Sequence, residues 1–298
     1  MTGMDDATRA VAEAAAARLG VPAGDAELIH LHSNATVALR SAGLVLRIST
    51  SPDAFDRIRG SVRVCRWLAA RGYPCTVPAD TEPWTEAGRI VSVWRYEDVV
   101  PEPPTSMAEF GSLLRKLHDE PVPPFQVRDL KDPFTSVAAA LDRATDGLGD
   151  VDHRWLRDRI RQLRIRWREL DLAVPPGLIH GDAHPGNLLR LRNGHLIAGD
   201  WDHTATGPRE WDLIQPLYTS RRFGAPDSGC LGQFAAAYEV DIRNWDGAAT
   251  LIAIREITGL SPYIRSAHAN DRNRAELEHR IATLRSGDES ARWRTSRD

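Results

Sequence analysis

Three polar side chains in the second half of the chain have the types and spacing that phosphoryl transfer requires. Asp182 lies in the stretch from His180 to Asn187, which reads His-Gly-Asp-Ala-His-Pro-Gly-Asn, and Asp200 follows. Transfer of a γ-phosphoryl group needs an oriented acceptor hydroxyl and a divalent cation on the phosphate oxygens. A carboxylate can accept the hydroxyl proton, and amide and carboxylate oxygens are hard ligands that magnesium prefers. We therefore predict Asp182 as the catalytic base and Asn187 and Asp200 as magnesium ligands.

The residues between Asn187 and Asp200 predict a β-hairpin. Two short apolar runs, 188–191 and 195–198, flank the dipeptide Asn193-Gly194. Both turn residues tolerate positive φ, which makes this pair a strong two-residue hairpin signal. Such a hairpin would fold Asp200 back beside Asn187. The alternative is that an isolated His-x-Asp is accidental and that an Asp at a strand end only caps a turn.

The ordered set resembles a known family. His180-x-Asp182-x4-Asn187 with Asp200 is similar to the catalytic loop and metal-binding aspartate of kinase-like enzymes. The residues of this loop resemble the aminoglycoside phosphotransferase and choline kinase branch more than they resemble protein kinases. Protein kinases usually place Arg between the His and the Asp and follow the metal aspartate with Phe-Gly, whereas Trp201-Asp202 follows here. The resemblance implies the roles given above for Asp182, Asn187 and Asp200.

A later segment extends the resemblance. Residues 209–213, Arg-Glu-Trp-Asp-Leu, are similar to the part of that branch in which an aspartate opening a helix supports the catalytic loop. The resemblance therefore implies that Asp212, together with His180, is a structural support. It also implies a small-molecule kinase that uses ATP or GTP with Mg²⁺.

The N-terminal third matches the family less closely. It has no GxGxxG loop, and the short polar segment with Ser33, Asn34 and Thr36 occupies the corresponding strand–turn–strand, so these three are candidate phosphate neighbours. An ordinary β-turn is the alternative. Arg47 lies where the family has a phosphate-binding lysine, and its planar fork can pair with phosphate oxygens.

Two features of this region remain open at the sequence level. The helix after Arg47 has Ser61 about where the family has a glutamate that orients its phosphate-binding lysine. Three explanations stay open: Arg47 is held differently, the lobe is less ordered without nucleotide, or Arg47 is an exposed strand residue. Arg95 and Tyr96 are candidates for the hinge, where backbone groups could pair with a purine edge. ATP and GTP are not distinguished.

The elements around these residues predict a bilobal α+β fold of the protein-kinase-like type. We expect a nucleotide-binding lobe at residues 1–97, a catalytic and substrate-binding lobe at 98–298, and an active site in the cleft between them. In the first lobe, the patterns predict helices at 5–19 and 52–72 and strands at 27–31, 37–48 and 89–96. In the second, they predict the hairpin and helices at 107–118, 136–144, 153–170, 208–222, 231–240, 245–267 and 272–284, followed by a frayed polar end from residue 286.

The acceptor is not readable from the sequence. By resemblance, the C-terminal helices line its pocket, and the candidate residues are Asp202, His203, Glu210, Glu256, Tyr263 and Arg265. Acidic and basic residues are nearly balanced from Asp241 onward, which argues against a polycationic acceptor. An antibiotic or other natural product fits, as does a primary metabolite such as a sugar, choline-like compound or amino alcohol. A nucleotide-binding protein that has lost catalysis is the alternative from another class.

The composition of the chain limits which partners and which cellular location we expect. The net charge of −3 gives no basic footprint for nucleic acid. No segment approaches the ~20 apolar residues that span a bilayer, and the N-terminus lacks a signal-peptide pattern. The 3 cysteines are widely spaced without a CxxC pair, as expected for thiols in a reducing compartment. We expect a cytoplasmic protein with no nucleic-acid or membrane partner, and with a nucleoside triphosphate and a small-molecule acceptor as its ligands.

Overall fold

The computed structural model describes residues 4–31, 34–51, 54–100, 105–143, 148–268 and 270–294. These form two compact units. The first comprises Met1–Thr105, Val122–Arg128 and His180–Ala205, and the second comprises Ser106–Pro121, Asp129–Ile179 and Thr206–Asp298. The catalytic segment predicted from the sequence thus lies in the same unit as the N-terminal sheet. These units do not coincide with a single cut between residues 97 and 98, so that boundary stays a prediction.

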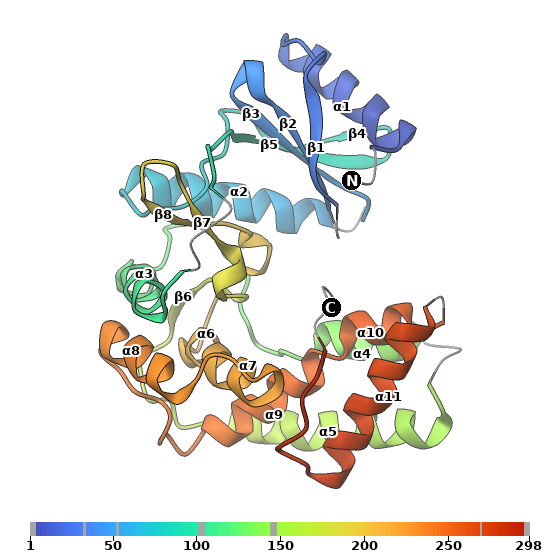
Figure 1. The fold of residues 1–298 in the computed structure, drawn as a ribbon, viewed down its shortest axis with the longest axis vertical. Helices are drawn as coiled ribbons and strands as arrows, with labels where there is room; N and C mark the ends of the chain where they lie inside the picture. Colours follow the sequence, from blue (N-terminus) through green and yellow to red (C-terminus); the bar gives the residue numbers. More distant parts are fainter. Residues whose placement is uncertain are drawn as a thin grey trace. The chain divides into compact units, whose positions relative to one another are not determined.

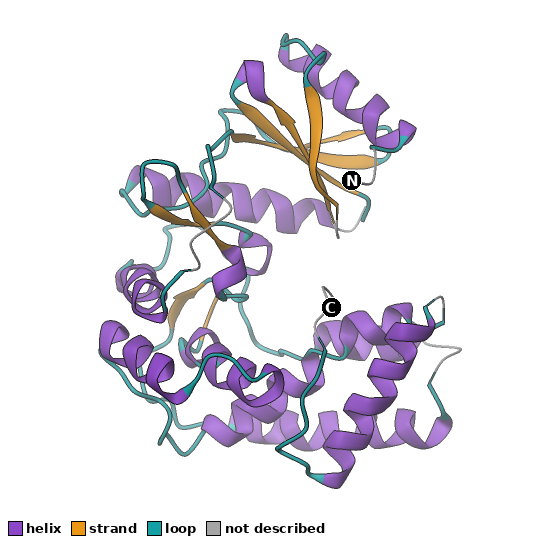
Figure 2. Cartoon of the chain, in the orientation of Figure 1, coloured by secondary structure: helices purple, strands orange, loops and turns teal. Residues whose placement is uncertain are grey.

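A five-stranded antiparallel sheet forms the centre of the first unit. Its strand order is β1-β2-β3-β5-β4, with β1 (Ala26–Leu31), β2 (Asn34–Leu39), β3 (Leu44–Ser49), β4 (Trp84–Glu86) and β5 (Arg89–Arg95) (Figures 1 and 2). Opposite residues in adjacent strands share a face, and side chains alternate along each strand. Val37, Leu46 and Val93 form one such cross-strand row, and Thr36, Arg47 and Ser92 form the next, on the opposite face.

The two faces of this sheet differ in character. Helix α1 (Asp6–Leu19) packs its small buried residues, including Val11 and Ala15, against the apolar row that contains Leu46. Asp5 caps this helix by accepting the Thr8 N–H at 2.7 Å. Helix α2 (Phe55–Ala70) contacts β5 and the short 3-10 helix Trp201–His203. One sheet face is therefore sealed by apolar packing, and the other presents Arg47.

The observed N-terminal strands correct two expectations. The segment 37–48 is not one strand, because a short 3-10 helix, Arg40–Ala42, and Gly43 at φ 65° divide it into β2 and β3. Asn34 and Thr36 belong to β2 rather than to a turn. Strand β4 was also missed, since three residues are too few to show a periodic pattern.

The expected hairpin is present in the first unit. Strands β7 (Leu188–Arg190) and β8 (Leu196–Ala198) pair antiparallel, with Leu189 opposite Ile197. Gly194 has φ 85°, but Asn193 has no positive φ, and the Gly194 N–H donates to the Leu191 carbonyl at 2.8 Å, so the turn is longer than the two-residue type that was expected. The Gly199 N–H donates to the Asn187 carbonyl at 2.8 Å. The hairpin therefore brings the chain that enters Asp200 back to Asn187, as predicted.

The second unit is mainly helical. Its helices are α3 (Met107–Asp119), α4 (Thr135–Arg143), α5 (Asp150–Arg168), α6 (Glu210–Leu213), α7 (Gln215–Phe223), α8 (Ser228–Tyr238), α9 (Ala248–Thr258), α10 (Ser261–Ser266) and α11 (Asp271–Ser286). Two short strands, β6 (Gly177–Ile179) and β9 (Ala205–Gly207), pair in a small sheet that was not expected. The expected helices at 208–222 and 245–267 are each divided in two, with Pro216 and Pro262 near the start of the second helix.

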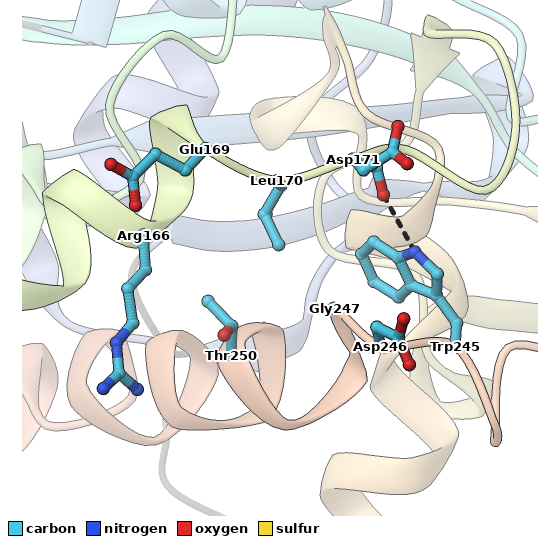
Figure 3. Close-up of a pocket in the computed structure, with 8 residues that line it drawn as sticks. All are labelled: Arg166, Glu169, Leu170, Asp171, Trp245, Asp246, Gly247 and Thr250. Atoms are coloured by element: carbon cyan, nitrogen blue, oxygen red, sulfur yellow. Dashed lines mark hydrogen bonds between the residues drawn. The ribbon is translucent and has the colours of Figure 1, made fainter.

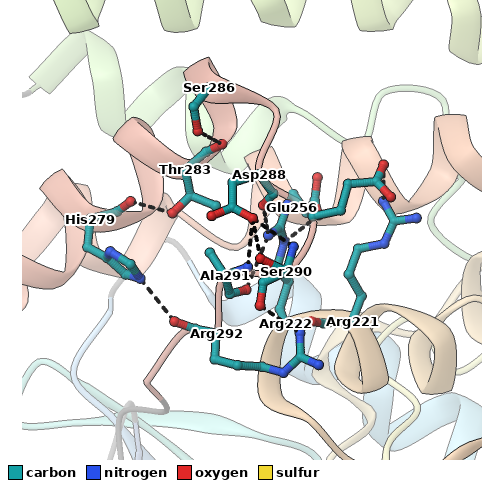
Figure 4. Close-up of polar contacts among 11 residues, drawn as sticks. Arg221, Arg222, Glu256, His279, Thr283, Ser286, Asp288, Ser290, Ala291 and Arg292 are labelled. Atoms are coloured by element: carbon teal, nitrogen blue, oxygen red, sulfur yellow. Dashed lines mark hydrogen bonds and ion pairs between the residues drawn. The ribbon is translucent and has the colours of Figure 1, made fainter.

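The C-terminal segment is packed rather than frayed, up to the last described residue. Arg222 donates to the carbonyl oxygens of Asp288 at 2.8 Å and Ala291 at 3.3 Å (Figure 4). The Trp293 N–H donates to the Arg222 carbonyl at 2.7 Å, and the indole is only 4% exposed. The expectation of a frayed end from residue 286 was therefore wrong for residues 286–294. It failed because a single buried tryptophan in a polar sequence gives no periodic signal.

None of the helices described here is both long enough and apolar enough to cross a bilayer.

Candidate active site

The loop with Asp182 follows directly after β6. Gly181 adopts φ 83°, and a Cβ built at this position would lie 2.1 Å from the His203 carbonyl oxygen, so only glycine fits. The buried His180 ring contacts the Gly199 carbonyl through Nε2 at 2.9 Å and packs at 4.7 Å against the Trp201 ring. His180 thereby joins the loop to the end of the hairpin. The supporting role implied for it stays a prediction.

Asp182 and Asn187 lie at the two ends of one loop. The Asn187 Nδ2 donates to the Asp182 carbonyl at 2.9 Å, a hydrogen bond that does not use the amide oxygen of Asn187. His184 accepts the Gly186 N–H at 3.1 Å, and its Nε2 lies 3.8 Å from Asp182 Oδ2. The His184 contact with Asp182 was missed at the sequence level, although both residues are in the motif.

Asp200 enters the site from the end of β8. It has φ 56° and ψ 62°, an uncommon conformation for a residue other than glycine, and its side chain is 47% exposed. Its Oδ1 lies 3.0 Å from Arg47 Nη2. Arg47 therefore pairs with the acid after the hairpin, a contact that was not predicted from the sequence, and its side chain is only 20% exposed.

Arg47 is surrounded by groups from three segments of the first unit. Its Nη2 also lies 3.1 Å from Asp202 Oδ2, and its guanidinium carbon lies 5.9 Å from the centre of the Trp94 ring. Desolvation acts to lower the pKa of Arg47, but Asp202 and Asp200 outweigh it, so that the pKa is raised. The guanidinium is charged at any working pH. Arg47 is thus a fixed positive charge beside the two acids.

Asp202 is already engaged by protein groups. Its side chain is 10% exposed, and besides Arg47 it accepts a hydrogen bond from Asn34 Nδ2 at 3.3 Å. Asn34 and Thr36 were expected near the phosphates, and Thr36 lies directly opposite Arg47 in the sheet. Both therefore lie close to Arg47. Ser33, the third residue expected there, lies outside the described residues.

The residue of α2 that interacts electrostatically with Arg47 is Cys65, one helical turn after Ser61. Burial and then the neighbouring Cys75 raise the pKa of the Cys65 thiol well above its ordinary value. The thiol is therefore neutral and cannot act as an acidic partner. The Ser61 hydroxyl is buried and, within the described part of the chain, has no hydrogen-bond partner. Sequence reasoning placed the missing acid at Ser61 and overlooked Cys65.

The two hinge candidates use their backbone donors inside the first unit. The Arg95 N–H donates to the Val77 carbonyl and the Tyr96 N–H to the Gly43 carbonyl, both at 2.8 Å. The Tyr96 hydroxyl is close to Arg40, whose guanidinium lies over its ring. A purine edge could not pair with these two donors while these bonds hold. Nucleotide contact by Arg95 and Tyr96 stays a prediction, and it would involve atoms other than these two backbone N–H groups.

His203, like Asp202, is a candidate acceptor residue in the 3-10 helix next to the catalytic loop. Its carbonyl oxygen accepts a hydrogen bond from Arg128 Nη2 at 2.7 Å. Desolvation lowers the pKa of His203, the neighbouring Asp182 acts in the opposite direction, and Arg128 and Arg57 lower the pKa further. The imidazole is therefore biased toward its neutral form beside Asp182. Arg128 had no motif in the sequence that would have revealed it.

Asp212 and Glu210 are buried in the second unit. Asp212 Oδ2 lies 3.2 Å from His118 Nε2, and His118 Nδ1 lies 2.7 Å from the Tyr238 hydroxyl. Glu210 Oε1 accepts the Val174 N–H at 2.8 Å. Both acids have structural partners here. The supporting role of Asp212 toward the catalytic loop stays a prediction, as does acceptor binding by Glu210.

The other three acceptor candidates also have partners within the second unit. Glu256 Oε1 lies 2.6 Å from Arg222 Nε, and both side chains are almost fully buried (Figure 4). The Tyr263 hydroxyl accepts from Arg280 Nη2 at 2.9 Å. Arg265 contacts the hydroxyls of Ser136 and Ser261. These contacts give each of the three side chains a partner within the protein. That they also bind an acceptor stays a prediction.

A hollow of about 340 Å³ also lies in the second unit, between the end of α5 and the start of α9 (Figure 3). Trp245 donates from Nε1 to the Asp171 carbonyl at 2.9 Å at one end of it. Its other lining residues are Arg166, Glu169, Leu170, Asp246, Gly247 and Thr250. No residue predicted for the site lines this hollow.

The donors near the hairpin suit magnesium. Within the described ranges, no cluster of three or more His, Cys, Asp or Glu side chains could hold a metal ion. Magnesium, however, is commonly bound by one or two carboxylates together with substrate phosphates and water. The exposed carboxylate of Asp200 and the amide oxygen of Asn187 match that pattern. The residues therefore fit a magnesium ion that arrives with a nucleotide.

Solved structures similar to this chain share its kinase-like fold. Choline kinase LicA from Streptococcus pneumoniae has a TM-score of 0.64 and 13% identity, covering 93% of this chain and 100% of that chain. Macrolide 2'-phosphotransferase MphH from Brachybacterium faecium has a TM-score of 0.56 and 21% identity, covering 90% and 96%. A spectinomycin phosphotransferase in complex with ADP and spectinomycin has a TM-score of 0.60 and 14% identity, covering 87% and 88%. These similarities confirm the predicted bilobal α+β fold.

Comparison with curated protein sequences gave no match. A family model described as "Phosphotransferase enzyme family" matches residues 26–251, a span that runs from the first strand of the sheet to helix α9 and includes the catalytic loop and the hairpin. The expected resemblance is thereby confirmed: the chain belongs to the phosphotransferase enzyme family.

Proposed function

We propose that the protein is a small-molecule kinase that transfers the γ-phosphoryl group of ATP or GTP to a hydroxyl group. One observation carries the proposal. Arg47, Asp182, Asn187 and Asp200 come together in one compact unit, where Arg47 contacts Asp200 at 3.0 Å and Asn187 contacts the Asp182 carbonyl at 2.9 Å. These are the cation, base and metal ligands that phosphoryl transfer requires.

Each residue has a separate task in this mechanism. Asp182 orients the acceptor hydroxyl and accepts its proton, and the hydrogen bond from Asn187 to the Asp182 backbone keeps that loop in place. Asn187 and Asp200 would hold magnesium, which neutralises charge on the phosphate oxygens. Arg47 supplies a forked positive charge to the phosphates. Direct transfer needs no covalent intermediate on the protein.

The acceptor class rests on the similar proteins and on charge. Their names include kinases of spectinomycin, macrolides and choline, so an antibiotic, another natural product or a small amino alcohol is a reasonable first panel. Glu256, one of the acidic acceptor candidates, pairs with the buried Arg222, and one carboxylate oxygen of Glu210, another candidate, accepts the Val174 N–H. This supports a neutral or mixed-charge acceptor over a polycation.

A product screen tests the proposal. Purified protein with MgATP or MgGTP should add ~80 Da, the mass of one phosphoryl group, to at least one hydroxylated antibiotic, nucleoside, sugar or amino alcohol. The Asp200→Ala variant, which loses the charged metal ligand, should give no product and no magnesium-dependent nucleotide binding. Tight nucleotide binding by the wild type, without product or slow nucleotide hydrolysis across a broad panel, would instead support the nucleotide-binding protein that has lost catalysis.

A further inference from the structure

Arg47 has two acidic partners that differ in their surroundings. Asp200 is 47% exposed and Asp202 only 10% exposed, although both lie about equally close to Arg47, at 3.0 and 3.1 Å. Asp202 also accepts a hydrogen bond from Asn34 Nδ2 at 3.3 Å, whereas Asp200 is the residue that fits magnesium. A carboxylate that coordinates a metal gives up charge to it and weakens as a partner for a nearby arginine. Of these two acids, Asp202 would therefore remain as the fixed partner of Arg47 when magnesium and nucleotide are bound.

Helix α2 provides no acid for this purpose. Its residue in electrostatic contact with Arg47 is Cys65, whose buried thiol stays neutral, and Ser61 carries only a hydroxyl. The 3-10 helix that contains Asp202 packs directly against α2. The carboxylate that orients the cation thus comes from the segment after the metal ligand rather than from the helix.

We propose that Asp202 is the positioning residue of Arg47: with Asn34, it keeps the guanidinium directed at the nucleotide phosphates while Asp200 binds the metal. This rests on the proposed function, and it removes Asp202 from the acceptor pocket. A rigid, charged partner is needed because an arginine side chain loses considerable rotamer freedom when it is held in one geometry.

Nucleotide binding tests the proposal without any knowledge of the acceptor. Calorimetry compares MgATP with adenosine, which has no phosphate, for the wild type, Asp202→Asn, Arg47→Met and the double variant. Asp202→Asn keeps the shape and one hydrogen-bond acceptor but loses the charge. Loss of a charged hydrogen bond predicts that it weakens MgATP binding by roughly 10- to 100-fold and leaves adenosine binding unchanged.

The double variant separates coupling from independent effects. In the Arg47→Met background, Asp202→Asn should weaken MgATP binding by less than about threefold, because the partner it positions is already absent. Glu27→Gln is the matched control, since Glu27 on β1 forms an exposed ion pair with Arg40 of the 3-10 helix after β2, and loss of this pair should change neither ligand's affinity.

Three results would overturn the assignment. Asp202→Asn could bind MgATP as the wild type does, the two substitutions could act additively, or adenosine and MgATP affinity could fall together, which would indicate a purely structural role. Each of these leaves the kinase proposal intact if the wild type still forms product. A wild type that binds no nucleotide would instead defeat the proposed function itself.

Discussion

At the scale of single residues, Asp182 is the group on which the proposed chemistry depends. Its carboxylate lies near His184 and interacts electrostatically with His203, while its backbone carbonyl is held by Asn187. Asp182→Asn preserves shape but cannot accept a proton. We expect turnover to fall by at least ~10²-fold with MgATP affinity near that of the wild type. Steady-state kinetics and calorimetry measure both, with the exposed Asp158→Asn as control. Unchanged turnover would exclude Asp182 as the base.

The residues that sequence reasoning found and those it missed differ in their separation along the chain. Asp182 and Asn187 interact within one loop, and a motif records such local spacing. Arg47 and Asp202 are separated by 155 positions, and their contact depends on how the hairpin meets the sheet. No pattern in the sequence encodes how the end of the hairpin packs against the sheet. Asp202 was predicted as an acceptor residue, and its pairing with Arg47 was not foreseen.

At the scale of elements, local turn chemistry determined what could be predicted. Asn193-Gly194 indicated the hairpin correctly, although only Gly194 has a positive φ and the turn is not the two-residue type expected. The turn at Gly43 was missed because the residues before it, Arg40 to Ala42, contain neither a Pro nor an Asn-Gly pair and are flanked by apolar residues on both sides. The strands β4, β6 and β9 have three residues each, too short for periodicity to reveal. Longer helices were recovered, although two of them are divided.

The catalytic loop requires glycine at one position, and a second glycine in the same segment provides a control. Gly181→Ala adds a Cβ 2.1 Å from the His203 carbonyl, so the loop must move. A shift of the base of about 1 Å can cost ~10²-fold, and we expect a loss of at least that size in kcat. Gly194→Ala has a similar positive φ of 85° but no atom within 4 Å of the added Cβ. It should cost about 1 kcal/mol of stability and leave kcat close to wild type. Equal kcat losses in both variants would show that strain, and not loop position, matters.

At the scale of the whole molecule, the order of residues along the chain does not reveal its compact units. The chain enters the first unit three times, and the segment His180–Ala205 joins the N-terminal sheet rather than the helices that flank it in sequence. A composition change near residue 97 was visible in the sequence, but a later return to the same unit was not. The site residues that are close in space consequently come from both halves of the chain.

The packed C-terminal segment gives a test of the second unit as a folded body. Trp293 lies between two buried arginines, with Arg222 and Arg280 at 4.8 and 4.7 Å from its ring. Its indole N–H is buried without a hydrogen-bond partner among the described residues. Removing the ring should therefore open a cavity, whereas replacing it with a smaller ring should remove an unsatisfied donor as well as some contacts.

We expect Trp293→Ala to lower the free energy of unfolding by about 3–5 kcal/mol, as for other large buried aromatic residues. Trp293→Phe should cost less than about 1.5 kcal/mol, because it keeps most of the apolar volume and eliminates the buried N–H. Urea unfolding measures both. MgATP affinity, measured at a temperature where each variant is folded, should not change, since Arg47, Asn187 and Asp200 all belong to the first unit. If Trp293→Ala is as stable as Trp293→Phe, the C-terminal segment is not part of the core, and the aromatic contacts around Arg222 and Arg280 contribute little to holding the helices together.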